Sequence, residues 1–165
     1  MNEEILQRAR KIKLLLMDCD GVLTDGRLYF TESGETMKVF HVRDGQGIVS
    51  WHRAGFRSGI ISGRNSPIVE IRAKELGIEF VRQGAADKIG VFEEILALAN
   101  VSAEETAFVG DDIPDIALFE RVGLAIAVAD AVEEAKAAAH FTTENKGGRS
   151  AVREIADWLL QAKEN

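Results

Sequence analysis

The chain has 165 residues and a formal net charge of −7, because 27 Asp and Glu residues outnumber 20 Lys and Arg residues. This length suits one domain with a buried core, and a composition of 46% hydrophobic and 28% charged residues is typical of a globular chain rather than a disordered one. The acidic balance disfavours a nucleic-acid partner, which would need a basic surface.

The N-terminal segment, residues 1–18, has neither a basic leader nor an apolar run near the ~20 residues that a membrane helix requires. The single cysteine, Cys19, excludes an intrachain disulfide framework and a CxxC metal site. We therefore expect one domain over residues 1–165, in a reducing, cytoplasmic setting and without a membrane association.

Apolar strand patterns alternate with helical patterns along the whole chain. The predicted strands, in chain order, are residues 13–17, 27–31, 36–42, 57–61, 79–82, 106–109 and 124–128, with a short one near Phe141. The predicted helices are residues 3–12, 46–53, 67–77, 87–100 and 114–123, one following Asp130, and a last one ending near Lys163. Helix caps are predicted at Ser66, at Ser102 with Glu105, and at Asp130 with Glu133. This alternation predicts βαβ units and an α/β fold, a Rossmann-like doubly wound parallel sheet covered by helices on both faces.

Residues 27–31 and 36–42 flank a turn at residues 32–35 and predict a β-hairpin over about residues 26–43. Within each strand, two apolar side chains share one face: Leu28 with Phe30, and Met37 with Val39. A projecting two-stranded ribbon cannot bury such a face alone, and exposed apolar patches usually mark interfaces. We therefore expect a homo-oligomer in which hairpins of several subunits pack together. The alternative is a hairpin that folds back onto its own domain.

Polar side chains follow three of the predicted strands at their carboxyl ends. They are Asp18 and Asp20, Ser62, and Asp111 with Asp112. Ligands of parallel sheets bind outside these ends, so we expect the side chains to converge. Converging carboxylates repel one another unless a cation lies among them, and hard oxygen ligands favour Mg²⁺. The intervals between these positions are already filled by the hairpin and the helices, which leaves no room for a separate cap domain.

Such a site suits phosphoryl transfer, which needs a nucleophile, a metal and donors for the phosphate oxygens. Asp18 could attack phosphorus and form an acyl phosphate. Asp20, two residues further on, could protonate the leaving alcohol and then activate water. Ser62 and Lys88 could bind the phosphate oxygens, since Lys88 begins a helix and therefore lies near its positive end.

Four segments in this order resemble the motifs of the haloacid dehalogenase-like phosphatases: D-C-D-G-V-L-T-D-G at residues 18–26, I-S-G-R at residues 61–64, Lys88, and G-D-D-I-P-D at residues 110–115. The resemblance implies Asp18 as nucleophile and Asp20 as general acid/base. It also implies Mg²⁺ held by Asp18, the Asp20 main-chain carbonyl and Asp111, with Asp112 and Asp115 as supporting acids.

Three further features resemble only some members of this family. They are the hairpin, R-D-G-Q-G at residues 43–47 and G-G-R-S-A-V-R-E at residues 147–154. They are similar to members of the family that remove phosphate from a sugar acid on the way to lipopolysaccharide. The substrate contacts this implies are His41, Val42, Arg43, Asp44, Gly45, Arg64, Arg72 and Lys88. The residue at one position that is basic in those members is Val49 here.

The same resemblance implies a tetramer. Without a cap domain, we expect a neighbouring subunit to help close each site, with Arg149, in the C-terminal tail at about residues 145–165, binding the substrate carboxylate of that neighbour. Three alternatives remain: a phosphatase for a nine-carbon acid of the sialic-acid type, a phosphoacceptor domain of receiver type, and a catalytically silent assembly module. A receiver has no need of an acid at the position of Asp20, and intact motifs disfavour a silent module.

Overall fold

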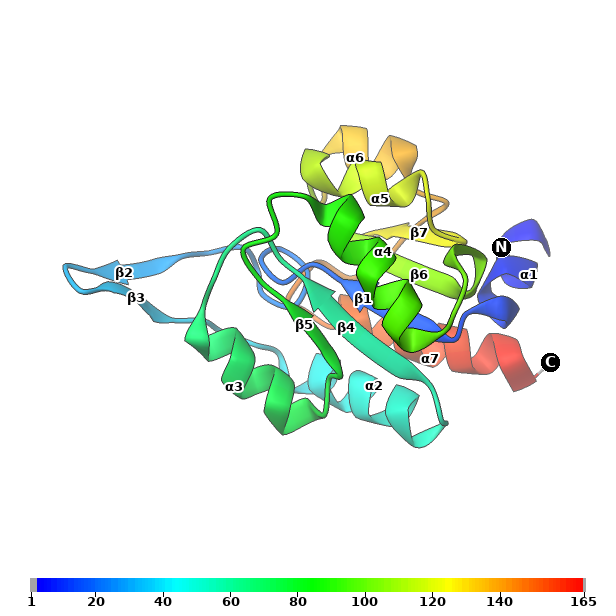
Figure 1. The fold of residues 1–165 in the computed structure, drawn as a ribbon, viewed down its shortest axis with the longest axis horizontal. Helices are drawn as coiled ribbons and strands as arrows, with labels where there is room; N and C mark the ends of the chain where they lie inside the picture. Colours follow the sequence, from blue (N-terminus) through cyan, green and yellow to red (C-terminus); the bar gives the residue numbers. More distant parts are fainter. Residues whose placement is uncertain (1–2, 165) are drawn as a thin grey trace.

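Six parallel strands form the central sheet, and helices cover both of its faces (Figure 1). The computed structural model describes residues 3–164, and the strand order is β5-β4-β1-β6-β7-β8. The strands are β1 (Leu14–Met17), β4 (Arg57–Ile61), β5 (Phe80–Arg82), β6 (Thr106–Gly110), β7 (Leu124–Ala127) and β8 (Phe141–Thr142). This order confirms the predicted Rossmann-like doubly wound sheet.

The helices form two layers around the sheet. They are α1 (Glu3–Lys11), α2 (Val42–Arg53), α3 (Pro67–Leu76), α4 (Lys88–Ala99), α5 (Ile116–Phe119), α6 (Glu133–Ala138) and α7 (Ala151–Glu164), with 3₁₀ turns at η1 (Ala103–Glu105) and η2 (Ile113–Asp115). Helix α2 contacts α3 and α7, and α7 contacts α1, so these four form one layer, whereas α5 contacts α4 and α6 in the other. No helix in the described part of the chain combines the length and apolar character of a membrane span.

The core lies between these layers and fixes the ends of the central strands. Strands β1, β6 and β7 are buried along their whole length, as expected for parallel strands covered on both faces. Trp51 of α2 is fully buried, and its indole N–H donates to the carbonyl oxygen of Arg57 at 2.8 Å. Helix α2 is thereby fixed to the start of β4, and the polar residues that follow the strands stand on a rigid frame.

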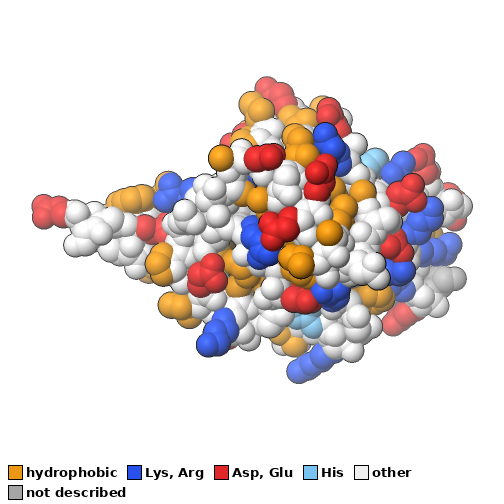
Figure 2. Space-filling view, in the orientation of Figure 1, with side chains coloured by type: hydrophobic (Ala, Val, Ile, Leu, Met, Phe, Trp, Pro, Cys, Tyr) orange, Lys and Arg blue, Asp and Glu red, His pale blue; other side chains and the backbone are white. Residues whose placement is uncertain are grey.

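The predicted hairpin is present and projects from the body of the molecule (Figure 1). It consists of β2 (Tyr29–Thr31) and β3 (Gly34–Met37), which form a separate antiparallel pair. The hairpin does not fold back onto its own domain, and hydrophobic side chains are visible along it (Figure 2). Between β1 and β4 the chain forms only this hairpin and α2, so no cap domain is inserted there.

Three local predictions are wrong, and two of them concern neighbouring segments. The predicted strand at residues 36–42 ends at Met37, and α2 begins at Val42 rather than at residue 46, with His41 as its N-cap. The helical pattern is hidden there because its first turns contain two glycines, which are poor helix formers.

The predicted cap at Asp130 is also wrong, since α6 is preceded by Val132 and has no side-chain cap. Asp130 instead accepts the backbone N–H of Gly147 at 2.9 Å. The carboxylate therefore holds the C-terminal tail rather than a helix of its own segment.

Candidate active site

A cavity of about 210 Å³ opens at the carboxyl ends of β1, β4 and β6. Its lining consists of Asp18, Asp20, Ser62, Gly63, Arg64, Lys88, Asp111, Asp112 and Pro114. The structure thus brings together the polar residues predicted to converge, although they come from segments far apart in the sequence.

Asp18 stands directly after β1, where its backbone N–H donates to the carbonyl oxygen of Val109 in β6 at 2.9 Å. Its Oδ1 accepts the N–H of Cys19 at 2.6 Å, and its Oδ2 accepts from Lys88 Nζ at 2.7 Å. Burial raises the pKa of Asp18 to about 6, although the charge of Lys88 opposes the rise. Both oxygens are therefore held in place while one edge of the carboxylate faces the cavity.

Lys88 joins the two acidic segments of the site. It begins α4 after the N-cap residue Asp87, and its Nζ donates to Asp115 Oδ1 at 2.7 Å as well as to Asp18. Burial by itself would lower the pKa of Lys88, but the two carboxylates raise it above its ordinary value. The ammonium group is therefore charged and fixed beside Asp18, as a phosphate-binding cation should be.

The residues present fit a divalent cation. Carboxylate oxygens of Asp18, Asp111 and Asp115 lie within 4.8 Å of one another. Burial and the neighbouring carboxylates of Asp115 and Asp18 raise the pKa of Asp111 to about 8. These groups repel one another in a partly buried place, and an ion with hard oxygen ligands, such as Mg²⁺, offsets that repulsion.

Asp115 and Asp112 shape the segment that carries Asp111. Asp115 is fully buried, and its Oδ2 accepts the backbone N–H groups of Asp111 and Asp112 at 2.9 and 3.3 Å. Asp112 caps η2 through the N–H of Ile113. The supporting roles of these two acids in the reaction stay a prediction.

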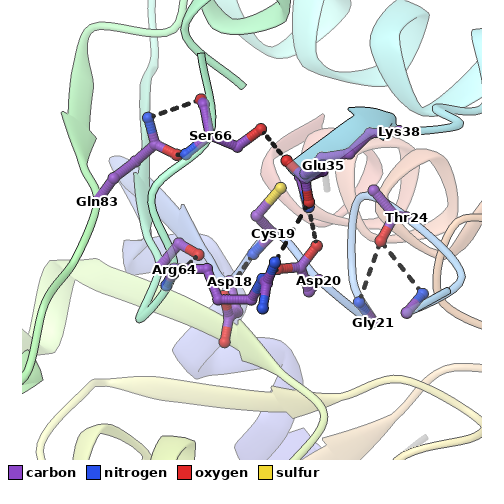
Figure 3. Close-up of polar contacts among 12 residues, drawn as sticks. Asp18, Cys19, Asp20, Gly21, Thr24, Glu35, Lys38, Arg64, Ser66 and Gln83 are labelled. Carbon is purple, nitrogen blue, oxygen red and sulfur yellow. Dashed lines mark hydrogen bonds and ion pairs between the residues drawn. The ribbon is translucent and has the colours of Figure 1, made fainter. Parts of the chain in front are cut away.

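Asp20 is held by cations on both of its oxygens (Figure 3). Lys38 Nζ donates to Oδ1 at 2.5 Å, and Arg64 Nε lies 3.4 Å from Oδ2. Lys38 also pairs with Glu35 at 3.0 Å, and Glu35 in turn accepts from Arg64 at 3.4 Å and from Ser66 Oγ at 2.5 Å. The hairpin therefore reaches the site through two side chains.

Lys38 and Glu35 were not among the site residues predicted from the sequence. One signal could have pointed to Lys38: it stands between Met37 and Val39, and alternation along a strand places it on the opposite face from these apolar residues. Its burial depends on a contact with Asp20, 18 positions earlier. No local pattern contains that contact.

The loop after Asp18 is completed by the C-terminal tail. Gly21 has a φ of +88°, and a Cβ there would overlap the carboxylate of Asp111. A Cβ at Gly147 would overlap the carbonyl oxygen of Gly21, and the N–H of Gly148 donates to the carbonyl oxygen of Val22 at 2.8 Å. Only glycine fits at these close approaches, which explains G-G in the tail.

The predicted sugar-acid contacts divide into two groups. Arg64 lines the cavity with Lys88, whereas Arg72 of α3 lines a neighbouring pocket of about 380 Å³ that also contains Lys38, Phe40 and Val42. Arg72 Nε is buried and has no hydrogen-bond partner among the described residues, while its guanidinium lies 5.7 Å from the centre of the Phe40 ring. Lys38 belongs to both groups, since it lines this pocket and contacts Asp20, and Arg72 Nη1 donates to Glu75 at 2.8 Å. A substrate contact of Arg72 stays a prediction.

Residues 41–45 form the cap and first turn of α2, outside the cavity that contains Asp18. Gly45 lies against the Arg72 guanidinium, and Val42 and Arg43 are exposed. His41 Nδ1 accepts the N–H of Arg43 at 3.2 Å. A substrate contact at these residues stays a prediction.

Asp44 has a role that its sequence position did not suggest. Its carboxylate is buried and accepts the backbone N–H groups of Ser150 and Arg153 at 3.2 and 2.9 Å, at the start of α7. Because the carboxylate is buried against the start of α7, a substrate contact of Asp44 would fall to its backbone. Val49 is half-buried in α2 and supplies no charge.

Arg149, predicted to act on a neighbouring subunit, is an exposed residue of the tail. Its guanidinium lies 3.8 Å from Asp25 of the same chain. Its role across a subunit boundary stays a prediction.

A family model described as haloacid dehalogenase-like hydrolase matches residues 51–155 of the chain. The chain belongs to the haloacid dehalogenase-like hydrolases. This membership confirms the predicted family and disfavours both the receiver-type alternative and the silent module.

Among curated proteins, this hydrolase is 42% identical over 162 residues to the 3-deoxy-D-manno-octulosonate 8-phosphate phosphatase of Yersinia pestis, covering 98% of this chain and 87% of the relative. It is 40% identical to the protein of the same name from Escherichia coli (strain K12), covering 99% of this chain and 87% of that one.

Solved structures of phosphatases with the same name are similar to this hydrolase in fold as well as in sequence. The crystal structure of the Yersinia pestis phosphatase superposes with a TM-score of 0.97 at 41% identity, covering 99% of this hydrolase and 89% of that chain. A Moraxella catarrhalis 3-deoxy-D-manno-octulosonate 8-phosphate phosphatase, solved in complex with a magnesium ion, a phosphate ion and a KDO molecule, superposes with a TM-score of 0.95 at 37% identity, covering 100% and 95% of the two chains.

Proposed function

We propose that this hydrolase removes the phosphate of 3-deoxy-D-manno-octulosonate 8-phosphate through an aspartyl-phosphate on Asp18, in the synthesis of a lipopolysaccharide precursor. The observation that carries the reaction is the cavity in which Asp18, Asp20 and Lys88 converge. The relatives named above, similar over nearly the whole chain, support the substrate.

In the first step, a carboxylate oxygen of Asp18 attacks phosphorus while the bond to the sugar oxygen breaks. Asp20 gives a proton to the leaving oxygen, and Lys88, Ser62 and Arg64 bind the other phosphate oxygens. In the second step, Asp20 takes a proton from water, which attacks the acyl phosphate. Phosphate leaves, and Asp18 is regenerated.

Asp18, Asp111 and the main-chain carbonyl of Asp20 would hold Mg²⁺ in this reaction. When bound, the ion offsets the negative charge that accumulates between the phosphate and the carboxylates. Asp115 keeps the Asp111 segment in place through its two backbone hydrogen bonds.

The substrate is tested by a screen of phosphate monoesters with Mg²⁺. We expect the eight-carbon sugar-acid phosphate to give the highest kcat/KM, above the nine-carbon sialic-acid-type phosphate and above hexose phosphates without a carboxylate. The released phosphate is measured directly. A preference for the nine-carbon acid would move the assignment to the alternative substrate, and equal rates with all esters would contradict a sugar-acid site.

The same proposal includes a homotetramer built through the hairpin. Four apolar side chains of the hairpin segment are between 45% and 59% exposed: Leu28, Phe30, Met37 and Val39. A projecting ribbon with such a surface gains stability only by packing against another chain, and four copies can close by rotational symmetry. The cytoplasmic setting also remains part of this proposal, supported by the free, buried Cys19.

Light scattering on the purified chain tests the assembly. We expect a mass of four chains at micromolar concentration, and we expect Phe30→Asp to reduce it, because a charge would then have to be buried at the interface. Leu98→Asp is the matched control, since Leu98 of α4 is 58% exposed against 59% for Phe30 but lies outside the hairpin. A wild-type monomer would refute assembly through the hairpin.

A further inference from the structure

We propose that Lys38 and Glu35 of the hairpin form a positioning pair for Asp20, so that the hairpin is part of the catalytic machinery as well as an assembly element. This inference rests on the proposed function, in which Asp20 transfers the proton. It assigns to two hairpin residues a task that the motifs of the family do not contain.

The first argument is geometric (Figure 3). Lys38 Nζ donates to Oδ1 of Asp20 at 2.5 Å, and the Lys38 side chain is only 1% exposed. One oxygen of Asp20 is thus fixed from the hairpin side. Oδ2 has only the longer contact, a 3.4 Å approach by the half-exposed Arg64, and we assign the transferred proton to this oxygen.

The second argument concerns charge. The Lys38 ammonium is buried, and a buried charge is costly unless it is paired. Glu35 supplies a second partner, because its carboxylate pairs with Lys38 at 3.0 Å. The ammonium is thereby kept in place beside Oδ1 of Asp20.

The third argument is the anchoring of Glu35. Its Oε2 accepts from Ser66 Oγ at 2.5 Å, and Ser66 precedes α3 without using its side chain as a helix cap. Its Oε1 accepts from Arg64 at 3.4 Å. Glu35 therefore binds the segment after β4 that carries Ser62 and Arg64, while Lys38 binds Asp20. The pair in this way connects the proton-transfer residue with the phosphate-binding loop.

The dependence on leaving group tests this role. An alkyl leaving oxygen must be protonated, whereas 4-nitrophenolate leaves without a proton, so only the alkyl ester depends on a well-placed Asp20. We expect Lys38→Met to lower kcat for the sugar-acid phosphate about tenfold more than kcat for 4-nitrophenyl phosphate. Glu35→Gln should change the ratio of the two rates in the same direction and by less. Lys74→Met and Glu134→Gln, at two exposed residues outside the hairpin, are the matched controls.

The ratio is measured on one preparation, so it does not depend on the fraction of folded protein. An unchanged ratio in Lys38→Met would overturn the inference and leave the proposed function standing, whereas a wild-type chain that hydrolyses neither ester overturns both. In an Asp20→Asn background, Lys38→Met should not change the ratio further. A further tenfold change there would mean that Lys38 binds the sugar acid itself, and this too would overturn the positioning role.

Discussion

Replacing Asp18 by Asn should lower kcat by about three orders of magnitude or more, because an amide does not attack phosphorus. The substitution preserves size and leaves one oxygen to accept from Lys88 or from the N–H of Cys19, so the fold should persist. Initial rates with Mg²⁺ give the loss. Acid quenching during turnover should trap a phosphorylated wild-type chain and no phosphorylated variant.

Asp157→Asn is the control for this substitution, since Asp157 is exposed on α7 and pairs only with Arg153 among the described contacts. It should retain normal activity. If the Asp18→Asn variant kept more than about a tenth of wild-type activity, a loss of under ~1.4 kcal/mol in the barrier, the aspartyl-phosphate pathway would be wrong.

Chelation should have an effect of similar size. EDTA should abolish turnover, Mg²⁺ should restore it, and Ca²⁺ should restore little, because Ca²⁺ takes more ligands at longer distances and disturbs the alignment of the attack. Full activity after exhaustive chelation would contradict a metal-dependent reaction.

Thermal unfolding offers a second measurement of the metal. Burial raises the pKa of both Asp18 and Asp111, and repulsion from the carboxylate of Asp115 adds to each rise, so a cation is needed to offset these charges. Mg²⁺ binds only the folded arrangement and should raise Tm by a few °C, about the shift that 1 kcal/mol produces. Asp111→Asn should lose this rise, whereas Asp157→Asn should keep it.

The sheet and its helices could be predicted because local patterns specify them. Apolar runs separated by turn residues gave the strands on either side of Ser62 and Asp111, and Pro67 with Gly77 marked both ends of α3. The start of α2 could not be predicted. Its glycines serve contacts with α3 and α7, and such tertiary contacts override the local preference against helix.

The active site also contains residues that could be predicted from the sequence and residues that could not. Asp18, Asp20 and Asp111 follow strands, so topology alone brings them together. Lys38 and Glu35 enter the site because the second strand of the hairpin returns to the body of the molecule beside Asp20. Asp44 is used by a helix that begins more than 100 residues later. Contacts of this kind depend on how segments far apart in the sequence pack together. Composition and motif spacing do not predict such packing.

The glycine contacts between the tail and the nucleophile loop have a consequence for biosynthesis. Asp18 directly follows β1, near the start of the chain, yet the loop behind it receives backbone contacts from Gly147 and Gly148. Translation must therefore pass Gly148 before the loop has its final partners. During elongation the growing polypeptide contains Asp18 before the contacts of Gly147 and Gly148 with its loop can form. Catalytic competence therefore arises late, after nearly the whole sheet has left the ribosome.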